Sequence, residues 1–276
     1  MKVIKQFIGG TTLVLVTIFF VSADILSRLV IAPLVHLYPG ARVRILTWWV
    51  HVLRRQMFGL MQHAGRARLD IQPVIPSRGG VLVVMNHQSI LDVPIVHACF
   101  PSGYPRMVAH VRYGKGVPLV SHMLSLYGHI MVQPGRTGRA DLEKLAETAR
   151  TSELPILIYP EGHRTRDGEI RPWKRGGLDV FLSARPWTVY VVVIDGLLHV
   201  ARLPDFVRNI TDVRCRVESV GPIEYDGRGR ESHHEFVERL RRVMCDKLRE
   251  MRADSGAGVA AQPTTKETAA DAVKAT

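Results

Sequence analysis

The sequence predicts an α/β fold, with a central sheet covered by helices on both faces and a preceding hydrophobic helical region that attaches to a membrane. Three observations support this prediction. Short apolar, β-branched runs recur between residues 79 and 196, segments of helical periodicity lie between and after them, and residues 7–37 are dominated by apolar side chains. We therefore expect three parts in the 276-residue chain: membrane-attachment helices over 1–65, an α/β domain over 66–252 and a disordered tail over 253–276.

The N-terminal region predicts an uncleaved membrane anchor. No charged residue occurs from Phe7 to Ala23, and Lys2 and Lys5 precede this stretch. A signal peptide has the same basic start, but the apolar sequence resumes over 29–38 and no small-residue cleavage site is evident. The charge-free stretch is at the short end for a membrane span, so a re-entrant or interfacial helix pair remains an alternative.

Residues 42–63 form a second, amphipathic segment of helical character. Trp48 and Trp49 lie among arginines, a pattern typical of the lipid headgroup region, although an ordinary packed helix is equally consistent with it. Because basic residues flank the first apolar stretch on both sides, charge does not fix its orientation.

The α/β elements follow from hydrophobic patterning. Apolar runs over 79–86, 154–160 and 187–196 predict buried strands, since strands apolar on both faces belong to sheets covered on both sides. Residues 140–150 begin with an acidic turn and end on arginine, which favours a helix. Residues 231–252 carry one apolar stripe at helical spacing, which predicts a helix packed on the core rather than on a membrane.

Composition narrows the class of function. The formal net charge is +12 and the pI is about 10.0, values that suit anionic membranes, anionic substrates or nucleic acid. No basic patch is interleaved with aromatic residues, so we expect no nucleic-acid partner. Cys99, Cys215 and Cys245 share no short spacing and predict reduced thiols in a cytosol-facing protein.

The first candidate motif is Asn86–Asp92 (NHQSILD), directly after a predicted strand. On one continuous helix, His87 and Asp92 would point about 140° apart. They meet if His87 lies in the turn and Asp92 begins the following helix. Asp92 then fixes the tautomer of the imidazole, and the other ring nitrogen takes a proton from an alcohol. The alternative is a capping aspartate beside an unrelated histidine.

The second candidate motif is residues 159–164 (YPEGHR), again beyond a predicted strand. Glu161 and Arg164 in a glycine-containing turn can hold a phosphate, and further basic residues follow, including Lys174. A solvated basic loop is the alternative. A third segment, 114–139, is basic at both ends and rich in glycine, but it lacks the P-loop pattern of nucleotide sites. No histidine pair has metal-ligand spacing, so we expect no metal site.

These motifs resemble those of the 1-acylglycerol-3-phosphate acyltransferases, a family of glycerolipid acyltransferases. NHQSILD matches the family's first block, a histidine and an aspartate separated by four residues. YPEGHRT resembles its third block, of the type Phe-Pro-Glu-Gly-Thr-Arg. The blocks occur in the family's order, and the resemblance covers roughly residues 40–200.

The resemblance implies roles for individual residues. His87 is the family's general base and Asp92 orients it, while Glu161, Gly162 and Arg164 belong to the block that binds the acceptor's phosphate. Basic residues at the place of Lys174 are also common in such enzymes. We expect the oxyanion formed in the reaction to be stabilised by backbone N–H groups near the histidine turn.

Three departures from the family pattern concern the acceptor. His163 stands in place of a threonine, and Tyr190 stands where a proline is usual. The second block usually ends in an arginine that contacts phosphate; here it reads Gln133-Pro134, and Arg136 is the nearest basic residue.

The resemblance thus implies an acyltransferase catalytic domain in a membrane-attached protein, facing the cytosol, at the inner membrane if the source is bacterial. It would move a fatty acyl group from acyl-CoA or acyl-carrier protein to the free hydroxyl of a lysophospholipid, first of all 1-acylglycerol-3-phosphate, giving phosphatidic acid. No cofactor is expected. The alternatives are another acceptor, such as a lyso-aminolipid or a lysolipid with a larger headgroup, and a non-catalytic membrane lipid-binding protein.

Overall fold

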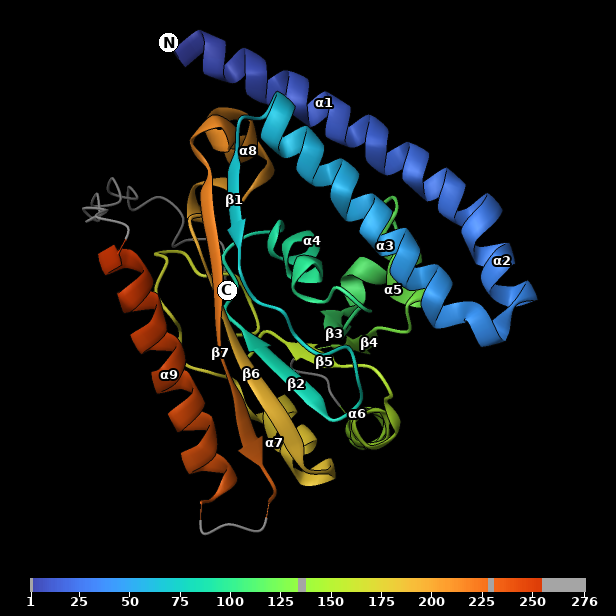
Figure 1. Ribbon diagram of the computed structural model, residues 1–276, viewed down its shortest axis with the longest axis vertical. Helices are drawn as coiled ribbons and strands as arrows, with labels where there is room; N and C mark the ends of the chain where they lie inside the picture. The colour runs from blue at the N-terminus through green and yellow to red at the C-terminus, as the bar shows by residue number, and fades with distance from the viewer. Residues whose placement is uncertain (1, 134–137, 228–230, 255–276) are drawn as a thin grey trace, which may run out of the picture.

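The computed structural model describes residues 2–133, 138–227 and 231–254. Figure 1 shows a central sheet between layers of helices, with the N-terminal helices along one outer edge. Arg136 and most of the tail predicted over 253–276 lie outside the described residues.

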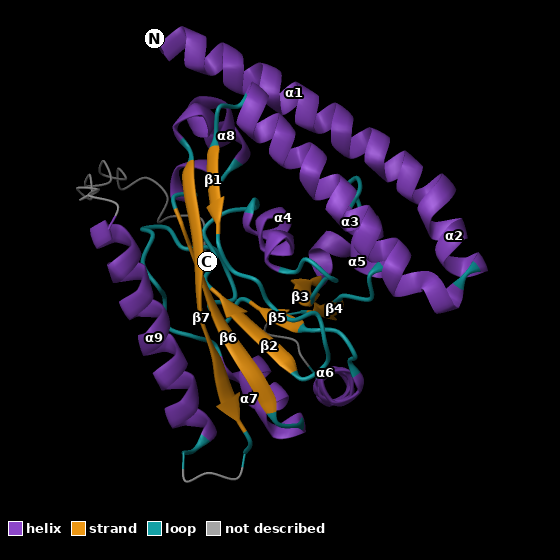
Figure 2. Cartoon of the chain, in the orientation of Figure 1, coloured by secondary structure: helices purple, strands orange, loops and turns teal. Residues whose placement is uncertain are grey.

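A seven-stranded sheet runs through the centre of the molecule, drawn in orange in Figure 2. Its order is β1-β7-β6-β2-β5-β3-β4, and every neighbouring pair is parallel except β6 with β7. The strands are β1 (Arg68–Ile71), β2 (Val81–Met85), β3 (Arg106–His110), β4 (Ile130–Val132), β5 (Ile156–Ile158), β6 (Trp187–Asp195) and β7 (Arg214–Tyr225).

Strand β2 is central because both its faces are apolar. Val83 packs in a core cluster with residues of α3 (Arg42–Gly59) and α4 (Asp92–Val96). Its neighbour Val84 packs in a second cluster on the opposite face, since successive side chains of a strand alternate between faces. The helices of the second face are α6 (Arg139–Thr151), α7 (Arg175–Ala184) and α9 (His233–Asp254). The predicted sheet with helices on both faces is confirmed.

The N-terminal helices form an outer layer. Helix α1 (Lys2–Leu26) continues through a π-helical turn into α2 (Ala32–Leu37), and α3 runs back beneath them (Figure 1). The stretch Lys2–Leu37 is long and apolar enough to cross a membrane, and only 17% of its most apolar window is buried. In α3, Trp49 packs into the core whereas Trp48 is 58% exposed. One tryptophan of the pair is therefore a core residue and the other lies on the surface.

The three strands and two helices predicted from the hydrophobic pattern of the α/β domain are all present, with ends shifted by a few residues. Helix α9 extends to Asp254, so residues 253 and 254 are helical rather than part of a disordered tail. Its buried stripe, which includes Phe236, Leu240 and Met244, confirms the packing role. Three further helices, α5 (Val120–Leu126), α7 and α8 (Leu203–Asn209), were not predicted. The three cysteines do not pair with one another.

Candidate active site

His87 and Asp92 meet in the turn between β2 and α4. Strand β2 ends at Met85, His87 follows in the turn, and Asp92 is the first residue of α4. The His87 Nδ1 atom lies 2.6 Å from Asp92 Oδ2, and Asp92 is completely buried. The turn, rather than a continuous helix, therefore brings the two side chains together as expected.

The Asp92 carboxylate also holds the turn itself. Its Oδ2 atom accepts hydrogen bonds from the backbone N–H groups of Gln88, at 2.7 Å, and Ser89, at 2.9 Å. An acceptor bound in this way requires Nδ1 of His87 to carry its proton, which leaves Nε2 with a lone pair. Among the described residues none bonds to Nε2, and 20% of the imidazole side chain is exposed. The free nitrogen can therefore reach a ligand.

Tyr159 fixes the plane of the imidazole. Its ring stacks on the ring of His87, with centroids 4.3 Å apart and planes 25° from parallel. Burial raises the pKa of Tyr159 well above its usual value, with a smaller contribution from the Asp92 charge, so the phenol stays neutral. The imidazole of His87 is thus held by one carboxylate and one aromatic ring.

Glu161 binds backbone groups on both sides of the site. Its Oε1 atom accepts from the N–H of His87 and its Oε2 atom from the N–H of Arg171, each at 3.0 Å. The side chain is 1% exposed, and burial raises the pKa of its carboxyl group. The structure brings this predicted binding residue to the site, but both carboxylate oxygens are already occupied by the protein.

Three of the remaining predicted binding residues, Gly162, Arg164 and Lys174, lie on the same loop as Glu161. Gly162 has φ 73°, and a β-carbon there would lie 2.9 Å from Cδ of Lys174, so glycine permits both the turn and the overlying lysine. Arg164 donates from Nη1 to the carbonyl of Ala201, which anchors its guanidinium. Lys174 is exposed and has no ion pair among the described residues. Arg136 cannot be placed, since it lies outside them.

The expectation about oxyanion donors is wrong for the nearest amides. The N–H groups of His87, Gln88 and Ser89 all donate to the carboxylates of Glu161 and Asp92. Because buried carboxylates form strong bonds to backbone N–H groups, these donors are committed to holding the turn.

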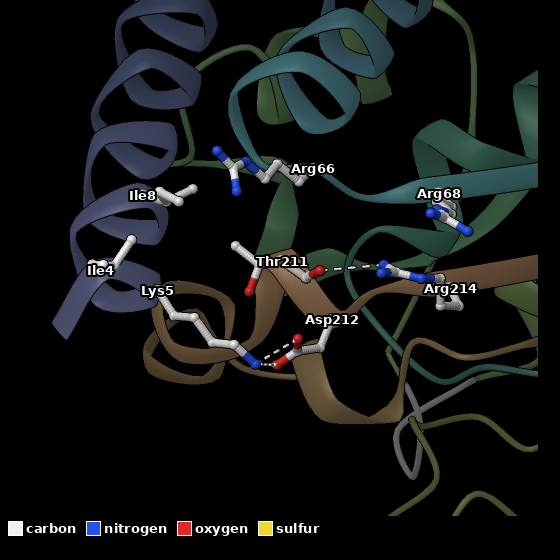
Figure 3. Close-up of a pocket in the computed structure, with 8 residues that line it drawn as sticks. All are labelled: Ile4, Lys5, Ile8, Arg66, Arg68, Thr211, Asp212 and Arg214. Carbon is white, nitrogen blue, oxygen red and sulfur yellow. Dashed lines mark hydrogen bonds and ion pairs between the residues drawn. The ribbon is translucent and has the colours of Figure 1, made fainter. Parts of the chain in front are cut away.

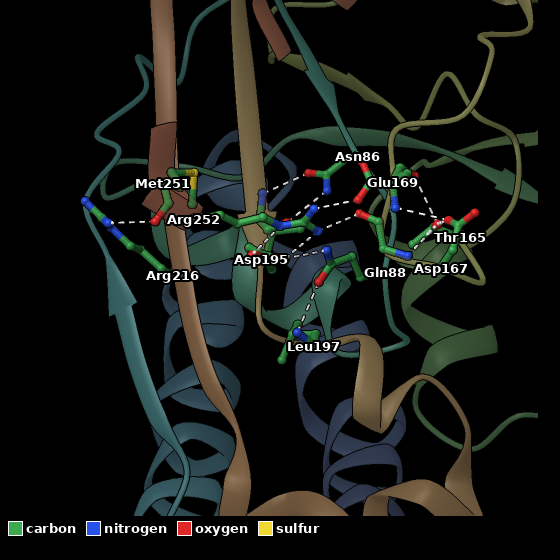
Figure 4. Close-up of polar contacts among 12 residues, drawn as sticks. Asn86, Gln88, Thr165, Asp167, Glu169, Asp195, Leu197, Arg216, Met251 and Arg252 are labelled. Carbon is green, nitrogen blue, oxygen red and sulfur yellow. Dashed lines mark hydrogen bonds and ion pairs between the residues drawn. The ribbon is translucent and has the colours of Figure 1, made fainter. Parts of the chain in front are cut away.

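A polar network behind the turn contains residues that the sequence did not single out (Figure 4). Gln88 donates from Nε2 to Asp195, at 2.9 Å, and accepts from the N–H of Leu197. Arg252, in the last turn of α9, bonds to Asp195 at 3.1 Å and to Glu169 at 2.7 Å. Gln88 lies within the recognised motif, but nothing local in the sequence connects Arg252 with it.

Two histidines outside the motif, His97 and His129, have strongly lowered pKa values. Burial lowers the pKa of His97 to about 3 and that of His129 to about 4. His129 Nδ1 accepts from the N–H of Met107 at 2.9 Å, which requires a neutral ring. Within residues 2–133, 138–227 and 231–254, no group of His, Cys, Asp or Glu side chains has the arrangement of a metal site.

Comparison with known proteins places this geometry in a family. Residues 66–195 match the family model described as Acyltransferase. This segment is an acyltransferase-family domain. It contains the His87–Asp92 pair and the loop with Glu161, and it confirms the resemblance drawn from the two sequence blocks.

Several relatives of this acyltransferase domain are named 1-acyl-sn-glycerol-3-phosphate acyltransferase. The bovine 1-acyl-sn-glycerol-3-phosphate acyltransferase alpha is 26% identical over 193 residues, covering 64% of this chain and 61% of the relative. The human protein of the same name is also 26% identical, with 64% and 62% covered. The Helicobacter pylori 1-acyl-sn-glycerol-3-phosphate acyltransferase is 33% identical over 100 residues, covering 36% and 41%. The chain thus spans about three fifths of the length of the mammalian relatives.

A solved structure shares the fold of most of the chain. The crystal structure of the 1-acyl-sn-glycerophosphate (LPA) acyltransferase PlsC from Thermotoga maritima superposes with a TM-score of 0.70 and covers 92% of this chain and 98% of its own. The two sequences are 20% identical. The two structures therefore share the α/β fold.

Proposed function

We propose that the chain is a membrane-attached O-acyltransferase that transfers a fatty acyl group from a thioester donor, acyl-CoA or acyl-carrier protein, to the free hydroxyl of 1-acylglycerol-3-phosphate. The carrying observation is the 2.6 Å contact between His87 Nδ1 and buried Asp92, with Nε2 left open. The three relatives reported above are named for this acceptor, which supports the choice of substrate.

The proposed reaction needs no covalent enzyme intermediate. Nε2 of His87 takes the proton of the acceptor hydroxyl while its oxygen attacks the thioester carbonyl, so that a C–O bond forms and the C–S bond breaks. Asp92 stabilises the imidazolium that results, because its negative charge lies against Nδ1. The imidazolium then returns the proton to the departing thiolate. The donor thioester is a co-substrate, and neither a metal nor a cofactor takes part.

The acceptor's phosphate requires a cation at the mouth of the site. Lys174 is exposed above Gly162 and has no ion pair among the described residues, so it is available to a ligand. Arg164 is anchored on Ala201 and can offer only its remaining N–H groups. We assign the phosphate contact first to Lys174, with Arg164 and Arg136 as further candidates.

Membrane attachment rests on α1 and α2. The exposed side chains of α1 and of the π-helical turn that joins it to α2 include Val3, Phe7, Ile18 and Leu29, each more than half exposed. Such an apolar surface is stable in lipid or against a partner. We propose that this surface lies in the bilayer, with the catalytic domain on its cytosolic side.

The test is an acyl-transfer assay with purified full-length protein against a panel of lysolipids that differ in headgroup. His87→Ala should abolish transfer and leave the circular dichroism spectrum unchanged. His63→Ala, at an exposed histidine on the same chain, is the matched control and should keep full activity. Retained transfer by His87→Ala would overturn the assignment of the base.

The same assay separates the alternatives. A preference for a lyso-aminolipid or a larger headgroup over 1-acylglycerol-3-phosphate would replace the proposed acceptor. Thioester cleavage at an equal rate without acceptor would indicate a hydrolase that uses the same base on water. Binding of lysolipid with no turnover would indicate a lipid-binding protein.

A further inference from the structure

A basic hollow of about 410 Å³ lies beside the N-terminal end of α1 (Figure 3). Four chain segments meet there: α1, the turn before β1, the start of β1 and the segment that leads into β7. The lining residues are Ile4, Lys5, Ile8, Arg66, Arg68, Thr211, Asp212 and Arg214. None of them belongs to the His87 turn or to the loop that carries Glu161.

The hollow has an excess of positive charge that the described residues do not balance. Lys5 is paired with Asp212, at 2.7 Å. Arg66, Arg68 and Arg214 have no carboxylate partner among the described residues, and all three are exposed. Arg214 donates only to two backbone carbonyls nearby. Three guanidinium groups therefore remain available to an anion.

The backbone around the hollow holds two unfavourable arrangements of its arginines. Arg68 and Arg214 are directly paired in the register of β1 and β7, and like charges opposite each other weaken a sheet. Arg66 has φ 57°, a left-handed conformation that disfavours side chains with a β-carbon, although Gly65 precedes it with φ −82°. A bound anion would relieve the opposition of the two charges, because it attracts both guanidinium groups.

The apolar residues of the hollow indicate what kind of anion fits. Ile8 and Arg66 face each other across the opening in Figure 3, and Ile4 lies one turn away on α1. The exposed apolar face of α1 continues from there through Val3 and Phe7. A ligand that satisfies both surfaces has an anionic head beside the arginines and an apolar chain along α1.

We propose that this hollow binds the headgroup of an anionic phospholipid of the bilayer, at a site separate from the acceptor site. The inference rests on the proposed membrane attachment through α1, but not on the acyl-transfer reaction. The headgroup phosphate contacts Arg66, Arg68 and Arg214, while Ile4 and Ile8 contact the first methylene groups of the lipid. The site would make attachment sensitive to the anionic lipid content of the membrane.

The test compares vesicle binding of the full-length protein and two double variants, at about 0.1 M salt so that distant charges are screened. One set of vesicles is phosphatidylcholine alone and the other contains phosphatidylcholine and phosphatidylglycerol in equal parts. The first variant is Arg68→Gln/Arg214→Gln. The control is Arg242→Gln/Arg249→Gln, which removes two exposed charges from α9, on the other side of the sheet.

We expect Arg68→Gln/Arg214→Gln to weaken binding to the phosphatidylglycerol vesicles by about 20–30-fold, since each basic residue at an anionic surface contributes about fivefold. Binding to phosphatidylcholine vesicles should not change, because it depends on α1. The control should lose less than about threefold. Without lipid, the variant should unfold at the same or a higher temperature than the wild type, since two opposed charges have been removed.

Three outcomes would overturn the proposal. Equal losses of vesicle affinity in the two double variants would show that the effect comes from the overall charge of the protein and not from the hollow. Unchanged binding by Arg68→Gln/Arg214→Gln would show that lipid does not occupy the hollow. Stabilisation of the wild type, but not of this variant, by inorganic phosphate, with no difference in vesicle binding, would assign the hollow to a soluble anion. Since no readout involves acyl transfer, a failure of the proposed enzymatic function would leave the result interpretable.

Discussion

Replacing Glu161 with glutamine separates two roles that this residue can have. The resemblance to known acyltransferases assigns it to substrate binding, whereas in the structure its two carboxylate oxygens accept from the backbone of His87 and Arg171, each at 3.0 Å. Glutamine has nearly the same shape but only one acceptor oxygen. In Glu161→Gln, one of the two backbone N–H groups must therefore face an amide NH₂ group.

The expected loss of stability follows from these contacts. A hydrogen bond to a charged group contributes about 1.5–3 kcal/mol, and a buried donor left unpaired costs about 1–3 kcal/mol. Burial raises the pKa of Glu161, which means that its charge carries a desolvation cost absent from glutamine and partly offsets the loss. We expect the free energy of unfolding to fall by about 2 kcal/mol.

The assay combines urea unfolding in detergent with steady-state kinetics. If Glu161 positions the His87 turn, kcat falls while KM for the acceptor changes little, since the substrate contacts are intact. Glu153→Gln, at an exposed glutamate without partners among the described residues, is the matched control and should change neither quantity. If Glu161→Gln has an unchanged free energy of unfolding, a raised KM and a normal kcat, the reasoning is refuted and Glu161 contacts the acceptor instead.

Three other predictions test the same site and its support. Asp92→Asn should lower kcat by about 10²–10⁴-fold with the fold retained by circular dichroism, because the amide cannot stabilise the imidazolium; full activity would exclude Asp92 from the mechanism. Gly162→Ala should lower the free energy of unfolding by about 1–2 kcal/mol through its left-handed backbone, and adding Lys174→Ala should recover only the part due to the close side-chain contact. The pKa values of His97 and His129 are lowered to about 3 and about 4 in the folded protein, so below about pH 6.5 the unfolded chain takes up a proton at each ring and the folded protein does not. The contribution of the two neutral rings to the free energy of unfolding is therefore complete above about pH 6.5. It falls by about 1.4 kcal/mol per pH unit for each ring as the pH decreases to about 4. Urea unfolding at pH 7 and pH 5 measures this loss, which His129→Gln should halve; an equal loss in that variant would contradict the assignment.

The parts of the fold that could be predicted are those in which burial dominates the sequence pattern. Strand β2 consists of five buried apolar residues, and α9 carries a regular apolar stripe, so both were evident. Strand β7 mixes charged and apolar residues because it lies second from the edge and is exposed along part of its length, and its pattern did not predict a strand. Strands β1 and β4, with four and three residues, are too short for periodicity to be informative.

In the candidate site, too, contacts between residues close in sequence could be predicted, whereas contacts between residues far apart in sequence could not. The meeting of His87 and Asp92 was predictable, because it depends on one turn five residues long. The partner of Glu161 was not, since its hydrogen bond to His87 joins two loops that only the pairing of β2 with β5 brings together. Arg252 reaches the network from the last turn of α9, and its exposed, basic neighbourhood in sequence resembles any solvated helix end.

The segment that carries Glu161 holds His87, the proposed general base, through its backbone. The N–H of His87 donates to Glu161, and its carbonyl accepts from the N–H of Thr165 at 2.8 Å, so both polar groups of that residue's backbone are bound by one loop. Arg252 holds the far end of this loop through the carbonyl of Gly168, at 2.9 Å, and Glu169. A displacement of α9 would therefore be transmitted to the position of Nε2 without any contact between α9 and the substrate. Rigid support of this kind is what proton transfer requires, because the rate depends on holding the base within hydrogen-bond reach of the acceptor hydroxyl.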